Sequence, residues 1–208
     1  MKIFVAGATG AVGLPLVRVL CAQGHKVTGM TRAGAGDDRL RALGARVTLA
    51  DAFHAEFVKD AIATASPDVV IDQLTWLPAN PADIVKSMPN DTRLHREGGA
   101  NLLSAAKALG VKRYVLQSRG FYLEAPQGSL ADETAALRYD APGEIGDSAR
   151  VIGADENRVT GSIALEGVVL RYGFFYGPGT WYRPGSRKTQ HRYATTSPTT
   201  QRRERPRE

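Results

Sequence analysis

Val5-Ala6-Gly7-Ala8-Thr9-Gly10-Ala11-Val12-Gly13 is the most informative stretch of this chain. Its three glycines have the spacing G-x-x-G-x-x-G, directly after the short apolar run at residues 2–6 and before apolar residues at helical spacing. A glycine-rich turn between a strand and a helix is typical of dinucleotide-binding proteins. The alternative interpretation is a turn that serves packing alone.

Each glycine has its own part in such a turn. Gly7 permits the sharp turn, Gly10 lets the backbone approach a pyrophosphate, and Gly13 allows the helix to pack against the strand. Free amides at the helix start then face the anion. The loop therefore supplies these predicted cofactor contacts: Gly7, Thr9, Gly10, Ala11, Val12 and Gly13.

Strands and helices alternate along the rest of the chain. Apolar runs predict strands at residues 2–6, 27–31, 46–49, 69–72, 114–117 and 167–171. Helical patterns occupy residues 11–22, 37–43, 55–64, 91–109 and 149–160, and the Pro-rich stretch 78–89 is predicted as a surface loop. Strands joined through helices pair in parallel, so we expect an α/β fold with a doubly wound parallel sheet, the Rossmann fold.

Charge and composition change near residue 183. Residues 183–208 hold 8 Lys and Arg against 2 Asp and Glu, which leaves 19 against 19 for residues 1–182. The excess of basic residues therefore belongs to the tail, and the predicted domain at 1–182 gives no indication of nucleic-acid binding. The tail has no Leu, Ile, Val, Phe or Met and is predicted to be disordered.

Other features narrow the class of protein. No apolar run approaches the ~20 residues needed to span a bilayer, so we expect a cytoplasmic protein without a membrane partner. Cys21 is the only cysteine and is predicted to lie on a buried helix face. The four histidines lack metal-binding spacing and are predicted to be surface or capping residues: His25, His54, His95 and His191.

The residue after the second predicted strand indicates which dinucleotide binds. Thr31-Arg32 stands there, with no acidic residue before Asp37. A guanidinium can fork onto a 2′-phosphate, whereas a carboxylate would bond a ribose 2′-hydroxyl, so Arg32 favours NADP, with NAD still possible. A solvated surface arginine is the alternative interpretation.

The string VAGATGAVG resembles the extended and atypical short-chain dehydrogenases/reductases, including the nucleotide-sugar epimerase/dehydratase relatives. Residues 167–179 resemble the sixth strand and following loop of the extended group, where nicotinamide and substrate meet. The resemblance implies that Asp51 lies beside the adenine ring, with capping of the next helix as the alternative. It also implies that Tyr172 and Tyr176 line the nicotinamide pocket, with ordinary core packing as the alternative.

The resemblance extends only in part to the catalytic residues. Active relatives use a Ser or Thr after the fifth strand, then a Tyr and a Lys four residues apart on the next helix. Ser118 fills the first position and Tyr122 matches a pocket tyrosine, which makes them the catalytic candidates. No Tyr-x-x-x-Lys occurs in the chain, so the usual acid–base pair is absent.

Two functions remain open from the sequence. The first is an NAD(P)-dependent oxidoreductase or epimerase/dehydratase-like protein acting on a nucleotide sugar or another small carbonyl or hydroxyl substrate. The second is a catalytically silent NADP-binding sensor or scaffold. The resemblance further implies a possible homodimer and a substrate domain that is largely missing, as in a C-terminally truncated chain.

Overall fold

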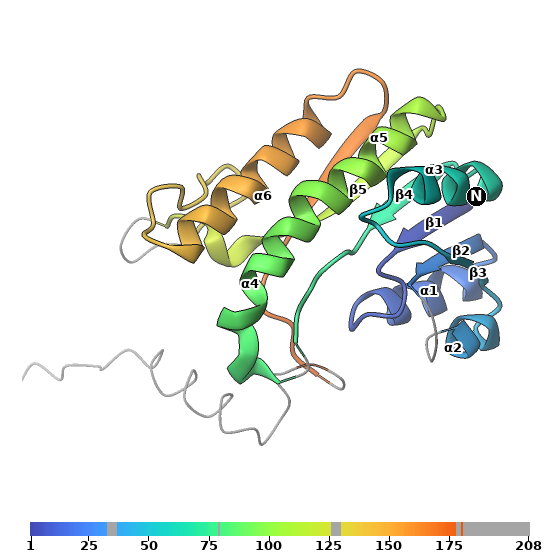
Figure 1. The fold of residues 1–208 in the computed structure, drawn as a ribbon, viewed down its shortest axis with the longest axis horizontal. Coiled ribbons are helices and arrows are strands. Elements are labelled where there is room, and N and C mark those ends of the chain that lie inside the picture. The colour runs from blue at the N-terminus through green and yellow to red at the C-terminus, as the bar shows by residue number, and fades with distance from the viewer. Residues whose placement is uncertain (33–36, 79, 126–129, 178–179, 181–208) are drawn as a thin grey trace, which may run out of the picture. The chain divides into compact units, whose positions relative to one another are not determined.

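The computed structural model describes residues 1–32, 37–78, 80–125, 130–177 and 180 (Figure 1). Residues 1–173 form one compact unit, and residues 174–208 belong to a second unit. In the second unit, Thr180 donates to the carbonyl oxygen of Gly177 through both its amide and its hydroxyl. The predicted disordered tail at 183–208 lies outside the described residues.

Six parallel strands form the sheet, in the order β3-β2-β1-β4-β5-β6. All neighbouring pairs are parallel, which confirms the predicted fold class. Ala6 pairs with Met30 on one side and with Asp72 on the other, so the carboxyl ends of three strands meet at one edge. The strands are β1 Lys2–Ala6, β2 Lys26–Thr31, β3 Arg46–Leu49, β4 Val69–Asp72, β5 Arg113–Arg119 and β6 Glu166–Tyr172.

Helices cover both faces of this sheet (Figure 1). On β1, Phe4 points to one core while Ile3 and Val5 point to the other, because side chains alternate along a strand. The Phe4 core packs under α3, α5 and α6, and the other core packs under α1 and α2. These helices are α1 Gly13–Ala22, α2 Asp37–Ala42, α3 Ala55–Ala65, α5 Ala100–Ala108 and α6 Glu144–Thr160. No helix among the described residues has the length and apolar content to cross a bilayer.

The stretch predicted as a surface loop is largely helical, and this prediction was wrong. A 3-10 turn at Pro81–Asp83 leads into α4 Ile84–Arg93, which continues through the π-helix Leu94–Gly99 into α5. Asn80 accepts a hydrogen bond from the amide of Ala82 and starts the turn. Pro89 lies inside α4, where packing of the long helix outweighs the one backbone hydrogen bond that a proline removes.

Helix boundaries differ elsewhere from the predicted ones. α1 begins at Gly13, two residues later than predicted, and α6 begins at Glu144, five residues earlier. Gly98 of the π-helix explains how the long helix approaches the segment after β3: a Cβ there would lie 2.9 Å from the Cβ of Ala52. Cys21 is half-buried against the core under α1, so its predicted helix face is confirmed.

Candidate functional site

Two glycines of the loop between β1 and α1, Gly7 and Gly13, leave no room for a side chain. Gly7 has φ +73°, and a Cβ there would meet the carbonyl oxygen of Gln73 at 2.3 Å. A Cβ on Gly13 would meet the carbonyl oxygen of Gly7 at 2.1 Å. The sharp turn at Gly7 and the close helix packing at Gly13 are thus both present, as the motif predicts.

The amides at the start of α1 are available to a ligand. Leu14 donates to the carbonyl oxygen of Gly10, which closes the first turn. Within the described part of the chain, the amides of residues 11–13 have no backbone acceptor. An anion at this point would meet unpaired N–H groups and the positive end of the helix dipole.

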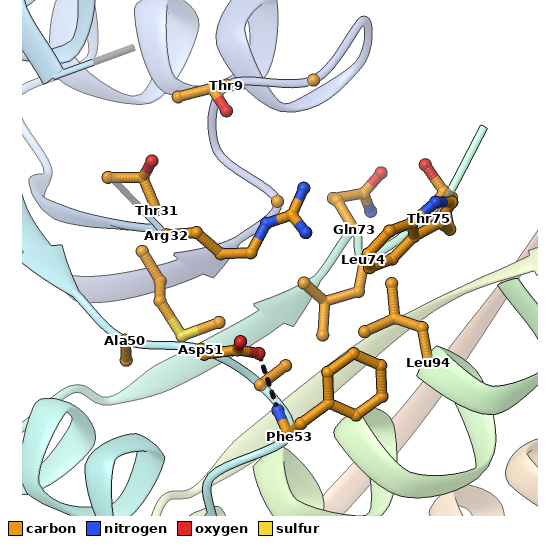
Figure 2. Close-up of a pocket in the computed structure, with 15 residues that line it drawn as sticks. Thr9, Thr31, Arg32, Ala50, Asp51, Phe53, Gln73, Leu74, Thr75 and Leu94 are labelled. Atoms are coloured by element: carbon orange, nitrogen blue, oxygen red, sulfur yellow. Dashed lines mark hydrogen bonds between the residues drawn. The ribbon is translucent and has the colours of Figure 1, made fainter. Parts of the chain in front are cut away.

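A cavity of about 240 Å³ lies at the carboxyl edge of the sheet (Figure 2). It is lined by the loop and by the residues that follow β2, β3 and β4. Five predicted cofactor contacts meet there, namely Gly7, Thr9, Gly10, Arg32 and Asp51. The other four, Ala11, Val12, Gly13 and Tyr172, are not part of its lining.

Arg32 extends into this cavity from the end of β2 (Figure 2). Its guanidinium carbon lies 4.7 Å from the centre of the Trp76 ring, a cation–π contact. Arg32 is exposed, so its contact with a cofactor phosphate stays a prediction. Trp76 was not predicted as a site residue, because the residues that it contacts, Arg32 and Phe53, follow β2 and β3 and are distant in sequence.

Asp51 forms a tight turn after β3. Its Oδ1 accepts a hydrogen bond from the amide of Phe53 at 3.0 Å, and its carboxylate lines the cavity (Figure 2). The residue that precedes α3 as its N-cap is His54, which makes no side-chain capping bond. The capping alternative for Asp51 is therefore wrong, and its adenine contact stays a prediction.

Buried polar groups mark the end of β4. The Asp72 carboxylate accepts hydrogen bonds from the Tyr114 hydroxyl at 2.7 Å and from the Leu74 amide at 2.9 Å. Burial raises the pKa of Asp72. The next residue, Gln73, lines the cavity and donates through Nε2 to the Tyr172 hydroxyl at 3.4 Å. Tyr172 therefore contacts a residue of the cavity lining without being part of that lining itself.

The two catalytic candidates lie away from this cavity. Ser118 is buried, and its hydroxyl donates to Glu156, which also holds Arg171 through two hydrogen bonds to Oε2 and one to Oε1. Tyr122 packs in a small core with Leu137, Ala149 and Ile152. The sequence of α6 contains no tyrosine or lysine. At the end of β5, Arg119 donates a hydrogen bond to the hydroxyl of Ser148 in α6.

A buried charge cluster next to these residues was not predicted. Arg119 forms an ion pair with Asp91 and donates to Nε2 of His95 at 3.1 Å, while Nδ1 of His95 lies 3.7 Å from Asp155. The prediction of His95 as a surface or capping residue is wrong, because the long helix turns it inward. The i, i+4 spacing of Asp91 and His95 was the available signal.

The cluster shifts the pKa values of its members. Burial and the charge of Arg119 lower the pKa of His95 to about 4. Burial also acts to raise the pKa of Asp91, but Arg119 and His95 outweigh it and the net shift is downward. Burial raises the pKa of Asp155 to about 6. Near neutral pH, His95 is therefore neutral and accepts from Arg119.

Comparison with known proteins identifies the family. A family model described as NAD(P)H-binding matches residues 7–156. The chain belongs to the NAD(P)H-binding family. A curated relative from Streptomyces sp., named 3-diazoavenalumate denitrifying reductase, is 45% identical over 185 residues, which are 88% of this chain. The chain spans 59% of that relative's length.

Solved structures of this family place the chain among the short-chain dehydrogenases/reductases and epimerases. UDP-glucose 4-epimerase from Thermus thermophilus in complex with NAD is 29% identical, with a TM-score of 0.73, and the match covers 86% of this chain and 57% of that one. A short-chain dehydrogenase/reductase protein from Agrobacterium tumefaciens with bound NAD is 25% identical, with a TM-score of 0.66 over 84% and 49%. The chain is thus an NAD(P)-binding member that spans about half of these neighbours.

Proposed function

We propose that this chain is an NADPH-dependent reductase that acts on a small electron-poor molecule. The observation that carries the proposal is the meeting of Gly10, Arg32 and Asp51 around one cavity. Their chemistry fits a dinucleotide, with unpaired amides for a pyrophosphate, a guanidinium for a 2′-phosphate and a carboxylate for the adenine end. The cofactor when bound would supply a hydride.

The lack of a Tyr-x-x-x-Lys in the sequence and the partner of Ser118 support one substrate class. Reduction of a carbonyl creates an alkoxide, which a general acid must protonate. The chain has no Tyr-x-x-x-Lys, and the Ser118 hydroxyl is already bonded to Glu156. A substrate whose reduction creates no alkoxide does not need that acid.

An aryl diazo group meets this condition. A diazonium nitrogen that accepts a hydride becomes an aryl diazene, which releases dinitrogen and ends with hydrogen on the ring carbon. The relative named as a diazo-compound reductase supports this substrate class. A nucleotide sugar has less support, because epimerisation removes and returns a proton at a sugar hydroxyl.

The experiment compares turnover of a hydroxyaryl diazo acid and of UDP-glucose, with NADPH or NADH, by loss of NADPH absorbance and by release of dinitrogen. A reaction without protein corrects for direct reduction by NADPH. We expect protein-dependent loss of the diazo compound with one dinitrogen released for each NADPH oxidised. NADPH binding without turnover of either substrate would contradict the reductase proposal.

That last result would favour the second candidate, a silent NADP-binding protein. The observation behind this candidate is the burial of Ser118 and Tyr122 among protein partners instead of along the cavity. A silent protein would bind NADPH and show no turnover, but would still change its stability with the cofactor.

A further inference from the structure

We infer that Trp76 is a positioning residue for nucleotide selection: its ring holds the Arg32 guanidinium beside the cavity through a cation–π contact, and the N–H donors of Arg32 stay available for the 2′-phosphate of NADPH. The inference rests on the NADPH preference proposed above. It adds a residue that the glycine motif and the end of β2 do not reveal.

The contact between Arg32 and Trp76 is a cation–π contact between the guanidinium and the ring. The guanidinium carbon lies 4.7 Å from the centre of the Trp76 ring. Arg32 makes no hydrogen bond or ion pair within the described residues. A guanidinium carries five N–H donors, and those of Arg32 are therefore free to fork onto a phosphate.

Trp76 can hold Arg32 in place because its own backbone is fixed. The amide of Trp76 donates to Oδ1 of Asp91 at 2.6 Å. Asp91 is buried and forms an ion pair with Arg119 at the end of β5. The loop after β4 is thereby anchored to both α4 and β5.

The Trp76 ring is supported from a second side. Its centre lies 6.4 Å from that of Phe53, with the ring planes tilted by 45°. The guanidinium carbon of Arg93 lies 4.4 Å from the centre of the Phe53 ring, and Nε of Arg93 donates to Glu97 at 2.9 Å. Arg32 therefore lies at the end of a series of contacts that runs through the Trp76 and Phe53 rings to Arg93.

The consequence is a selective effect on one nucleotide. A free arginine loses side-chain freedom when it binds a phosphate, and an arginine already held against a ring loses less. An exposed cation–π contact is worth about two- to fivefold in an equilibrium constant. Loss of the ring should weaken NADPH binding by this factor and leave NADH binding unchanged, because NADH has no 2′-phosphate.

A double-mutant cycle tests the inference on the full chain. NADPH and NADH are titrated by fluorescence against wild type, Trp76→Leu, Arg32→Ala and the double variant, with Trp76→Phe as the variant that retains a ring. Thermal melting of each protein confirms that it is folded. We expect Trp76→Leu to weaken NADPH binding about two- to fivefold and to leave NADH binding unchanged. In the Arg32→Ala background, Trp76→Leu should not weaken NADPH binding any further. Trp76→Phe should retain most of the affinity that Trp76→Leu loses.

Other outcomes overturn the inference and are distinguishable. An equal loss for NADPH and NADH in Trp76→Leu would mean that the ring contacts the shared part of the nucleotides. If Trp76→Leu weakened NADPH binding equally in the wild-type and Arg32→Ala backgrounds, Trp76 would not act through Arg32. Equal binding of both nucleotides by wild type would instead overturn the NADPH preference itself, and this inference with it.

Discussion

Arg119 and Asp91 form a buried ion pair at the carboxyl end of β5, and Asp91 also accepts the amide of Trp76. One carboxylate thus joins the last residue of a strand to the loop that borders the cavity at the carboxyl edge of the sheet. Both side chains are almost fully buried. A charge in such a place is costly when its partner is removed.

Replacement of Arg119 by Met is therefore expected to destabilise the fold. The variant leaves Asp91 buried without its cation, which costs about 3–5 kcal/mol of the free energy of unfolding. Arg150→Met is the matched control, because its ion pair with Asp147 is more than half exposed and such pairs contribute less than about 1 kcal/mol. Denaturant titration measures both. An equal loss of unfolding free energy in the two variants would contradict the claim that burial makes the Arg119–Asp91 pair more important than an exposed pair.

The pH dependence of stability should change when His95 is replaced by Gln. The pKa of His95 is about 4 when folded and 6.5 when unfolded, so the unfolded chain binds more protons between these values. This residue therefore makes wild type lose stability as pH falls from 6.5 to 4. The stability of His95→Gln relative to wild type should therefore rise as pH falls from 6.5 to 4.

Asp155→Asn should show the opposite trend. The pKa of Asp155 is about 6 when folded and 3.8 when unfolded, so the folded chain binds more protons between these values. Asp155 thus contributes stability that grows as pH falls from 6, and the Asn variant loses it relative to wild type. Denaturant midpoints at several pH values test both variants, and parallel curves for wild type and either variant would contradict the assigned shift.

Gly13→Ala is expected to distort the loop. The new Cβ would lie 2.1 Å from the carbonyl oxygen of Gly7, a backbone atom that cannot move aside alone. Overpacking of this kind costs about 1–3 kcal/mol, and the displaced loop should also bind NADPH more weakly. Gly173→Ala is the control for melting temperature, because a Cβ there meets nothing within 4 Å. A normal melting temperature in Gly13→Ala would show that the close packing is not required.

The strands could be predicted because their determinants are local. Apolar runs such as Ile3, Phe4 and Val5 fill both cores of a doubly wound sheet, and this pattern is visible without the fold. Pro89 misled the prediction of 78–89, because proline usually ends helices but α4 tolerates it through packing.

The site was only partly predictable for a different reason. The glycine loop, Arg32 and Asp51 each follow a strand directly, so their common edge could be inferred from the parallel order. Trp76 and His95 acquire their roles from residues distant in sequence, including Arg32, Phe53 and Arg119. No spacing rule relates such positions before the chain is folded.

The most direct test of the central claim is the dissociation constant of NADPH and of NADH for wild type and Arg32→Ala. Arg113→Ala serves as the control, because Arg113 lies at the amino end of β5, opposite the site. Loss of a charge-assisted phosphate contact predicts NADPH binding weaker by about ten- to a hundredfold in Arg32→Ala, with NADH and the control variant unchanged. NADPH binding that is the same in wild type and Arg32→Ala would contradict the account.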